Sequence, residues 1–367
     1  MTSPDRMALV AISHQGSRQA LRLQQGLPQA ELFLPKRFQL TEGSRAQVWH
    51  GRTAELVERL FPEYRSIVIF GSVGMAVRLI APLVRDKHTD PAVVAIDDAG
   101  RFAVSLLSGH LGGANALAAL AGEILGAQPV ITTASDALGT LAVDLLGREF
   151  GWRLENAARV TRVSAAVVNG ERVGLLQETG EREWWPCERP LPPNLVRFEG
   201  LEELVAAGCQ AAIIITDRVL SPWEELLPPF VLLRPRSLVA GIGCNRGTAR
   251  AEIEEAIRAA FTGHGLALAS LASLGTVDLK QDEPGLRQYA EGLGVELQLF
   301  SPQELNSVEG LLNPSAVVEE WIGSRGVCEP AALLASGAAA LLIPKLKTKN
   351  VTVAVARRGF TAAKEDR

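Results

Sequence analysis

The sequence has few of the residues that build metal centres and disulfide frameworks. Its 367 residues include four cysteines and five histidines. No two cysteines form a C-x-x-C pair and no histidine cluster accompanies them, which argues against a tetrahedral metal site. We therefore predict no protein metal site. Free thiols, as expected in a cytoplasmic protein, are predicted at Cys187, Cys209, Cys244 and Cys328.

Long apolar runs and a strong net charge are also missing. Polar residues 2–6 precede the first apolar stretch, residues 7–12, which is too short for a signal peptide or a membrane span. The formal net charge is −4, which argues against a dedicated nucleic-acid binder. We therefore predict a cytoplasmic protein with neither a membrane nor a nucleic acid as its partner.

The common nucleotide-binding patterns are absent as well. No G-x-x-x-x-G-K-[ST] string occurs, and the glycines of GIGCNRGT, residues 241–248, are one residue off the dinucleotide fingerprint. A nucleotide- or dinucleotide-binding enzyme is therefore a disfavoured interpretation. A binding titration with NAD or ATP would distinguish it from the others.

What the chain does have is an alternation of short apolar runs and helical patterns, which is typical of α/β layers. We predict several α/β-layered domains with mixed sheets, the last a separate α/β unit. Asn169-Gly170 joins two runs that look extended, so a β-hairpin is predicted there. Residues 179–194 are expected to form an irregular loop or lid. The predicted parts are an N-terminal domain with a Gly-His-rich loop at 1–134, a middle domain at 135–233, a C-terminal domain at 238–359 and a tail at 360–367.

The stretch SLLSGHLGGANALA, residues 105–118, places a histidine between glycines where an apolar strand ends and a helix begins. Ligands of open α/β sheets bind at such corners, and helix N-termini offer N–H groups to anions. His110 titrates near neutral pH and is a candidate acid or base. A structural turn is an equally good interpretation of the spacing. The candidate binding residues here are Ser108, Gly109, Gly112, Gly113 and Asn115.

Two further glycine corners carry candidate ligand contacts. GSVGMAVR, residues 71–78, follows a strand and could present backbone N–H groups to an anion, although ordinary strand-to-helix geometry is slightly favoured. In residues 241–248 a carboxylate or phosphate could be held at the helix start. The candidate residues are Gly71, Gly74 and Arg78 in the first corner, and Arg246 and Thr248 in the second.

Two acidic residues stand directly before prolines, Glu283 in DLKQDEPGL and Glu329 in GVCEPAAL. Helix capping is the favoured interpretation of both, and a binding role, shared with Lys280, is the alternative. Lysines alternate in PKLKTKN, beginning at Lys345. They suit a polycarboxylate ligand or, alternatively, a solubilising edge strand.

Several long strings resemble one known family, the CbiG family of cobalt-precorrin-5A hydrolases, and cover nearly the whole chain beyond about residue 60. The resemblance implies anaerobic cobalamin biosynthesis. It implies a substrate whose ring A δ-lactone is hydrolysed and whose former bridging carbon leaves as acetaldehyde, giving cobalt-precorrin-5B. The cobalt then arrives with the tetrapyrrole, so no other cofactor is expected. The strings are VRLIAPLVRDKHTDPAVVAIDDAGRFAVSLLSGHLGGANALA, PVITTASDALGTLAVD, AGIGCNRGT, DLKQDEPGL, GVCEPAALLASG and PKLKTKNVTVAVAR.

For such a substrate we expect His110 to transfer protons. Asp97 or Asp98, at the preceding turn, would orient it or act as a second base, and Asp136 is another acid at a strand end. Lysines, arginines and helix N-termini would hold the carboxylates of the substrate. The resemblance leaves open a homodimer and transient contact with neighbouring pathway enzymes. The alternative function is a tetrapyrrole carrier or scaffold without chemistry, favoured if His110 and nearby acids are dispensable while Lys345, Lys347 and Arg246 control binding.

Overall fold

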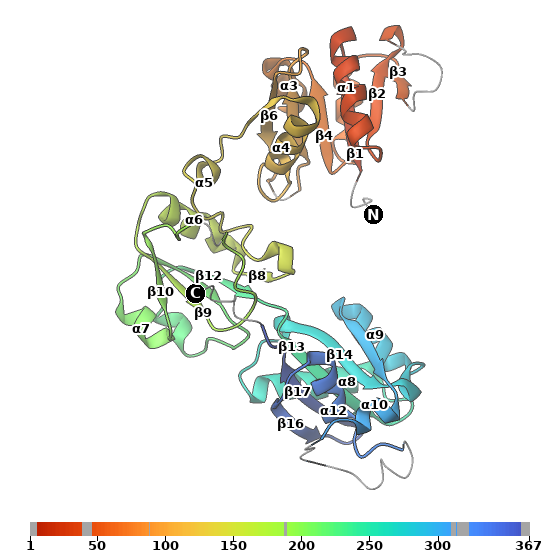
Figure 1. Ribbon diagram of the computed structural model, residues 1–367, viewed down its shortest axis with the longest axis vertical. Coiled ribbons are helices and arrows are strands. Elements are labelled where there is room, and N and C mark those ends of the chain that lie inside the picture. Colours follow the sequence, from red (N-terminus) through yellow and green to blue (C-terminus); the bar gives the residue numbers. More distant parts are fainter. Residues whose placement is uncertain are drawn as a thin grey trace. The chain divides into compact units, whose positions relative to one another are not determined.

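A computed structural model describes residues 6–38, 46–87, 89–186, 189–309, 313 and 323–360. The chain divides into two compact units, Met1–Leu145 and Leu146–Arg367, and each is described by itself (Figure 1). Cys187 and residues 361–367 of the predicted tail lie outside the described residues. The other three cysteines are free thiols, as predicted. Within the described residues, none of the helices combines the length and the apolar character needed to cross a bilayer.

The first unit is built on a seven-stranded sheet in the order β3-β2-β1-β4-β5-β6-β7. Apolar side chains of β1 and β4 alternate between two buried clusters, because helices cover both faces of the sheet. Helices α1 (His14–Gly26) and α4 (Ala114–Leu125) cover one face, and α2 (Thr53–Leu60) and α3 (Val73–Ile80) cover the other. The strands are β1 (Met7–Ala11), β2 (Glu31–Pro35), β3 (Ala46–Trp49), β4 (Ser66–Phe70), β5 (Ala92–Ile96), β6 (Phe102–Leu107) and β7 (Gln128–Val130).

The direction of β6 decides which loops share an edge of this sheet. Strands β5 and β6 form an antiparallel hairpin in which Ile96 pairs with Ala103 and Val93 with Leu107. The other neighbouring strands run parallel, β6 and β7 included. The carboxyl end of β6 therefore lies at the opposite edge from the carboxyl ends of β4 and β5. The segment that follows β7, with the short helix α5 (Ala134–Ala137), starts at the β6 edge.

The second unit contains two five-stranded mixed sheets, which confirms the predicted fold class. The first has the order β10-β9-β11-β12-β8, with β8 antiparallel to β12 and the other pairs parallel. Helices α6 (Val160–Val168) and α7 (Leu201–Ala206) accompany it. Its strands are β8 (Arg153–Glu155), β9 (Val173–Gln177), β10 (Leu195–Phe198), β11 (Ala211–Ile215) and β12 (Phe230–Arg234).

The β-hairpin predicted around Asn169-Gly170 is wrong. Residues 160–168 form helix α6, Asn169 caps its carboxyl end, and β9 begins only at Val173. The helix buries Val160, Val163, Ala166 and Val167 on one face, which is helical spacing. The left-handed backbone of Gly170 (φ 72°) ends the helix instead of turning a hairpin.

The loop around Trp184 is irregular, as predicted, but this tryptophan is not part of a free lid. Its ring is buried, 8% exposed, and its indole N–H donates to Gln177 Oε1 at 2.8 Å. A large ring that is covered and hydrogen-bonded in this way packs as part of the core around β9.

The second sheet of this unit has the order β15-β14-β13-β17-β16. Strands β13, β14 and β15 run parallel, β17 runs antiparallel to β13, and β16 antiparallel to β17. Helices α8 (Arg250–Gly263) and α9 (Pro284–Leu293) cover one face, and α12 (Cys328–Ser336) packs on the other; α10 (Pro302–Asn306) is short. The strands are β13 (Leu238–Cys244), β14 (Leu271–Val277), β15 (Glu296–Phe300), β16 (Leu341–Lys347) and β17 (Val351–Arg357).

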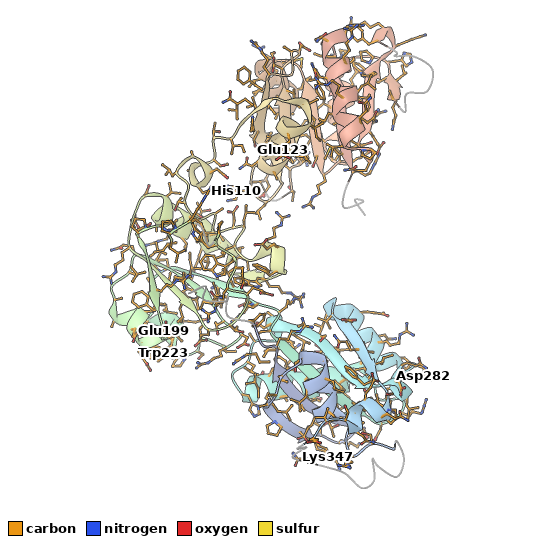
Figure 2. All side chains as sticks on the ribbon, viewed as in Figure 1. His110, Glu123, Glu199, Trp223, Asp282 and Lys347 are labelled. Atoms are coloured by element: carbon orange, nitrogen blue, oxygen red, sulfur yellow. The ribbon has the colours of Figure 1, made fainter. Side chains whose placement is uncertain are left out.

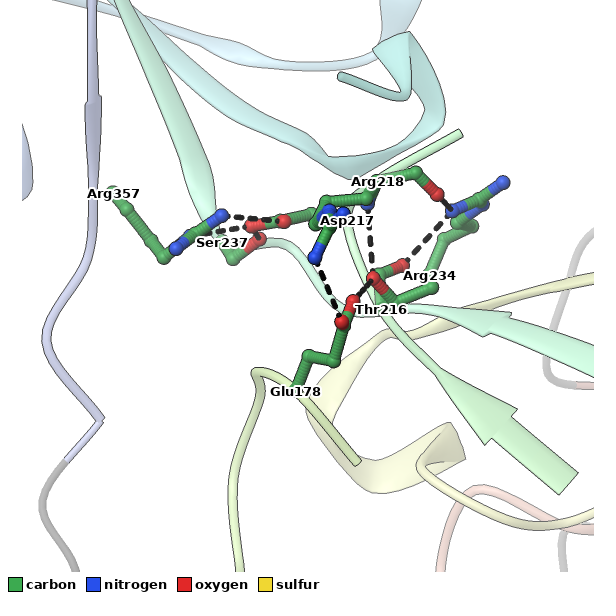
Figure 3. A network of polar contacts seen from close by, with 7 residues as sticks. All are labelled: Glu178, Thr216, Asp217, Arg218, Arg234, Ser237 and Arg357. Carbon is green, nitrogen blue, oxygen red and sulfur yellow. Dashed lines mark hydrogen bonds and ion pairs between the residues drawn. The ribbon is translucent and has the colours of Figure 1, made fainter. Parts of the chain in front are cut away.

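A polar network joins the two sheets of the second unit at Asp217 (Figure 3). Asp217 follows β11, is 1% exposed, and accepts hydrogen bonds from Arg357 Nε and Nη2, both at 2.8 Å. It also accepts one from Ser237 Oγ at 2.7 Å. Because its carboxylate is buried, these charge-assisted bonds replace the water it has lost.

Asparagine in place of Asp217 should therefore destabilise the protein. The change leaves the Arg357 guanidinium without its counter-charge, and we expect the free energy of unfolding to fall by about 2 kcal/mol. Breaking a fully buried ion pair usually costs about 3–5 kcal/mol. The cost is smaller here because 35% of the Arg357 side chain is exposed. Urea unfolding followed by circular dichroism measures the effect. The surface pair Glu254–Arg258 supplies the control Glu254→Gln, expected to cost less than about 0.5 kcal/mol. Equal stabilities of the two variants would contradict this role for Asp217.

Candidate active site

His110, labelled in Figure 2, lies in the loop between β6 and α4. Its ring is held between two carboxylates. Its Nε2 is 2.9 Å from Asp136 Oδ2 and its Nδ1 is 3.2 Å from Asp144 Oδ1. The hydroxyl of Ser135 also lies 3.0 Å from Nε2. The ring is 19% exposed and the Asp136 side chain 44%, so solvent and small ligands reach this group.

The glycines predicted to contact a ligand are needed for the shape of this loop. A Cβ on Gly109 would lie 2.6 Å from Asn115 Oδ1, and one on Gly112 would lie 2.3 Å from Ser108 Cβ. Gly113 has φ 95° where it caps α4, a left-handed conformation that favours glycine.

Ser108 has a left-handed conformation as well (φ 54°), and its hydroxyl donates to Asp90 O at 3.0 Å. The loop is thus folded tightly behind His110; a role of these residues in binding stays a prediction.

Asp136 is held in place by donors from two further elements. The amide Nδ2 of Asn115, at the start of α4, donates to Asp136 Oδ2 at 3.0 Å and to Thr133 Oγ1 at 2.8 Å. Thr133 Oγ1 donates to the same carboxylate oxygen. Asn115 is itself fixed, because its Oδ1 accepts from Ser105 Oγ at 2.7 Å. The bonds that Asp136 forms with Asn115, Thr133 and His110 all involve Oδ2 and not Oδ1.

The two carboxylates strongly favour the protonated form of His110. Hydrogen bonding to Asp144 is the largest influence, burial opposes it, and Asp136 adds to it, so the pKa of His110 rises to about 9. Burial alone would raise the pKa of Asp136, but the hydrogen bonds from Thr133 and His110 outweigh it and the pKa is lowered. The pKa of Asp144 is lowered likewise, by His110 against burial. At neutral pH the centre is an imidazolium between two carboxylates.

Such a centre offers both partners of acid–base catalysis. The imidazolium can give a proton to a developing oxyanion, and the accessible carboxylate of Asp136 can take one from water or an alcohol. Sequence reasoning found His110 and Asp136 but missed Asp144, Thr133 and Ser135. The only signal for them is that all three fall in the string PVITTASDALGTLAVD, whose last residue is Asp144.

The prediction that Asp97 or Asp98 orients His110 or acts as its second base is wrong. Both residues lie in the β5–β6 turn, at the other end of β6 from His110. Asp97 Oδ1 accepts from the backbone N–H groups of Arg101 and Phe102, both at 2.7 Å. Asp98 accepts from Ser13 Oγ. These carboxylates therefore stabilise the turn and the start of α1 rather than the histidine.

The corner at Gly71 also belongs to that opposite edge. Its N–H donates to Ile96 O at 2.8 Å, and Ser72 caps α3 by accepting from Met75 N at 3.3 Å. The structure therefore does not bring Gly71, Gly74 and Arg78 to His110. A role for them in binding stays a prediction for a separate site.

The two Glu-Pro corners of the C-terminal sheet hold loops together. Glu283, 3% exposed, is the N-cap residue of α9, yet its side chain accepts from Gly247 N at 2.9 Å and pairs with Lys280 at 3.2 Å. Glu329, 2% exposed, accepts from Lys345 N at 2.9 Å. The predicted cap position is thus confirmed for Glu283, although its side chain bonds the neighbouring loop and not the helix. For Glu329 the capping interpretation is wrong, because Val327 is the N-cap residue of α12 and Glu329 lies in its first turn.

The remaining candidates of this region have local partners. Thr248 is buried and its hydroxyl donates to Asn245 O at 2.7 Å. Arg246 is exposed and lies 3.4 Å from Asp282 Oδ2, a solvated pair of little energetic weight. Binding roles for these residues stay predictions.

Comparison with known proteins relates nearly the whole chain to one protein family. Family models match in chain order: Cobalamin synthesis G N-terminal at residues 55–136, Cobalamin biosynthesis central region at 141–235, and Cobalamin synthesis G C-terminus at 238–356. The chain is 43% identical to cobalt-precorrin-5A hydrolase of Priestia megaterium over 352 residues, 95% of this chain and 94% of that protein. It is 33% identical to cobalt-precorrin-5A hydrolase of Salmonella typhimurium strain LT2 over 372 residues, 95% and 97% of the two chains. A crystal structure of a cobalamin biosynthesis protein G homologue from Sulfolobus solfataricus aligns over 96% of this chain and 97% of that one, with 20% identity and a TM-score of 0.38.

Proposed function

Because the chain belongs to the family of cobalt-precorrin-5A hydrolases, we propose that its His110 centre carries out that hydrolysis. The chain is a hydrolase of cobalamin biosynthesis that acts on cobalt-precorrin-5A. The observation that supports the placement of the reaction is the contact of one imidazole with two carboxylates, 2.9 and 3.2 Å away. No comparable set of acid and base follows from the other corners considered above.

The first step adds water across the acyl C–O bond of the ring A lactone. The Asp136 carboxylate takes a proton from the attacking water, and the tetrahedral oxyanion then expels the ring oxygen. The His110 imidazolium gives its Nε2 proton to that departing oxygen, so the products are an alcohol and a carboxylic acid, which then loses its proton to solvent. The neighbouring Ser135 and Asp144 keep the ring oriented while its charge changes.

The second step breaks the carbon–carbon bond that holds the two-carbon unit. A base removes the alcohol proton, the C–O bond becomes the carbonyl of acetaldehyde, and the bonding electron pair stays on the macrocycle. After the first step His110 is neutral, so it can take this proton at the same position. The substrate's own cobalt draws electron density from the macrocycle, and we therefore propose that the protein needs no cofactor of its own.

The rate should depend on pH through His110. Its raised pKa, about 9, results first from the hydrogen bond to Asp144 and then from Asp136, against the effect of burial. The imidazolium is therefore present below pH 9 and lost above it, so kcat/KM should stay flat through neutral pH and fall as pH rises through about 9. Initial rates of acetaldehyde release between pH 6 and 10, corrected for spontaneous lactone opening, measure this. An alkaline limb near 6.5, the ordinary histidine pKa, would contradict the geometry.

The function itself is tested by anaerobic incubation of the purified protein with cobalt-precorrin-5A, while acetaldehyde is trapped. We expect one acetaldehyde per substrate and a product lighter by the two-carbon unit. Tight binding without acetaldehyde would favour the carrier function instead. We further propose a cytoplasmic location, a homodimer and transient contacts with neighbouring pathway enzymes. Cell fractionation would test the location, and size determination would test the homodimer and the contacts.

A further inference from the structure

A cavity of about 350 Å³ lies in the C-terminal part of the chain, away from the residues of the His110 centre in the sequence. Three segments line it: the end of β13 with Cys244, the start of α12 with Glu329, and the β16–β17 hairpin with Lys345, Lys347 and Lys349. Lys347 is labelled in Figure 2. Sequence reasoning singled out Glu329 and the lysines, but the hydrolysis at His110 does not use them.

The topology explains why these lysines meet the end of β13. Cys244, the last residue of β13, pairs with Val351 at the start of β17, and Lys347 pairs with Thr352. The hairpin turn at residues 348–350 thus sits at the carboxyl edge of the parallel strands β13 and β14. In open α/β sheets this is the edge where ligands bind.

The lining is cationic. Among the described residues that line the cavity, three lysines face one acid, Glu329. That carboxylate is buried and already accepts from Asn313 N at 3.1 Å, Asn313 Nδ2 at 2.8 Å and Lys345 N at 2.9 Å. Burial raises the pKa of Cys328 to about 11, so this thiol stays neutral and adds no negative charge.

Two of the lysines are available to a ligand. Lys345 Nζ lies 3.5 Å from Asn313 O, whereas Lys347 and Lys349 are exposed and form no ion pair with any residue in the described ranges. Ammonium groups without a protein counter-charge beside a cavity are suited to carboxylate ligands. The amino end of α12 lies at the same cavity and adds to its positive potential.

We propose that this cavity binds acidic side chains of the tetrapyrrole substrate through Lys347 and Lys349, an assignment that rests on the proposed function. Tetrapyrrole precursors carry acetate and propionate groups around the ring. The cavity is at the small end of ligand pockets, which span roughly 300–1,000 Å³. It accordingly accepts the carboxylates along one edge of the macrocycle and leaves the reacting ring outside.

Binding of uroporphyrin I, an octacarboxylate tetrapyrrole, to the full chain tests this without turnover. Quenching of tryptophan fluorescence gives the Kd for the wild type and for the double variant Lys347→Gln/Lys349→Gln. A charge-assisted contact is worth about 1.5 kcal/mol or more, so the variant should bind at least tenfold more weakly. The wild type should lose affinity with added salt more steeply than the variant. Lys36→Gln, an exposed lysine in the first unit, is the matched control and should bind like the wild type.

Two further arms separate the possible failures. Equal Kd values for the wild type and the double variant would overturn the site. Tricarballylate bound as tightly as uroporphyrin, with the same lysine dependence, would overturn the tetrapyrrole assignment in favour of a free polycarboxylate. Binding is read without acetaldehyde release, so a failure of the proposed hydrolysis would leave this result interpretable on its own.

Discussion

Glutamine in place of His110 is expected to lower kcat for acetaldehyde release by roughly 100- to 10,000-fold, the usual contribution of a positioned acid–base group. The substitution removes the imidazolium that contacts both Asp136 and Asp144. The glutamine amide still donates hydrogen bonds, but it cannot transfer a proton at neutral pH. KM should change much less, because the proton is needed by the departing oxygen and not by the bound substrate.

Anaerobic assays of trapped acetaldehyde measure this effect, with circular dichroism as the check on folding. His50→Gln is the matched control, because His50 is exposed and belongs to the same unit. We expect the control to retain wild-type kinetics. Turnover of His110→Gln within a few fold of the wild type would remove the histidine from the mechanism. Retained turnover would assign the proton transfer to other residues, whereas binding of the substrate by the wild type without acetaldehyde release would favour the carrier function.

The positions of His110 and Asp136 could be predicted from the sequence because each lies in the short segment that follows an apolar run, His110 after β6 and Asp136, in α5, after β7. A strand end is a local feature, and the side chains just beyond it collect at one edge of the sheet. Strand direction then decides at which edge they lie, and β6 runs antiparallel to β5. Asp97 and Asp98 lie in the turn of the β5–β6 hairpin, which places both residues one strand length from His110. For the six residues of β6 that is roughly 20 Å.

The helix α6 was missed for a different reason. Asn-Gly is a strong hairpin signal, but the same pair also ends helices, since glycine adopts the left-handed conformation in both settings. The burial pattern distinguishes the helix from the hairpin, because Val160, Val163 and Val167 recur at helical spacing and are buried in the second unit. A periodic pattern over nine residues therefore outweighs a two-residue turn motif.

Asp144 could not be predicted because it reaches His110 from an irregular segment. Residues 138–147 contain no helix or strand that would place their side chains by periodicity. The contact depends on how this segment returns to the loop after β6, which is a tertiary property. The same limit applies to the lysine hairpin: alternation predicted a charged strand face, but only the pairing of β17 with β13 brings that face beside a cavity.

Asparagine substitutions at the two carboxylates should differ in how much rate they remove, although both residues contact the same ring and both raise the pKa of His110, Asp144 the more strongly. Asp136→Asn removes the accessible base, so kcat should fall by roughly 100-fold or more at every pH. Asp144→Asn removes the largest influence that raises the His110 pKa. Its main effect should be to move the alkaline limb of kcat/KM from about 9 to lower pH, with a smaller loss of rate near pH 6.

Full pH profiles of both variants, measured by acetaldehyde release, distinguish a base from a positioning residue. If Asp136→Asn shifted the alkaline limb and kept its rate, and Asp144→Asn lost its rate without a shift, the two assignments would have to be exchanged. Asp144 is the less exposed of the two, 21% against 44%, and among the described residues the side chains that bond Asp136 use its Oδ2 and leave Oδ1 as an acceptor. Solvent access and a free acceptor are both required of the group that activates water, and only Asp136 combines them with direct contact to the ring that supplies the proton.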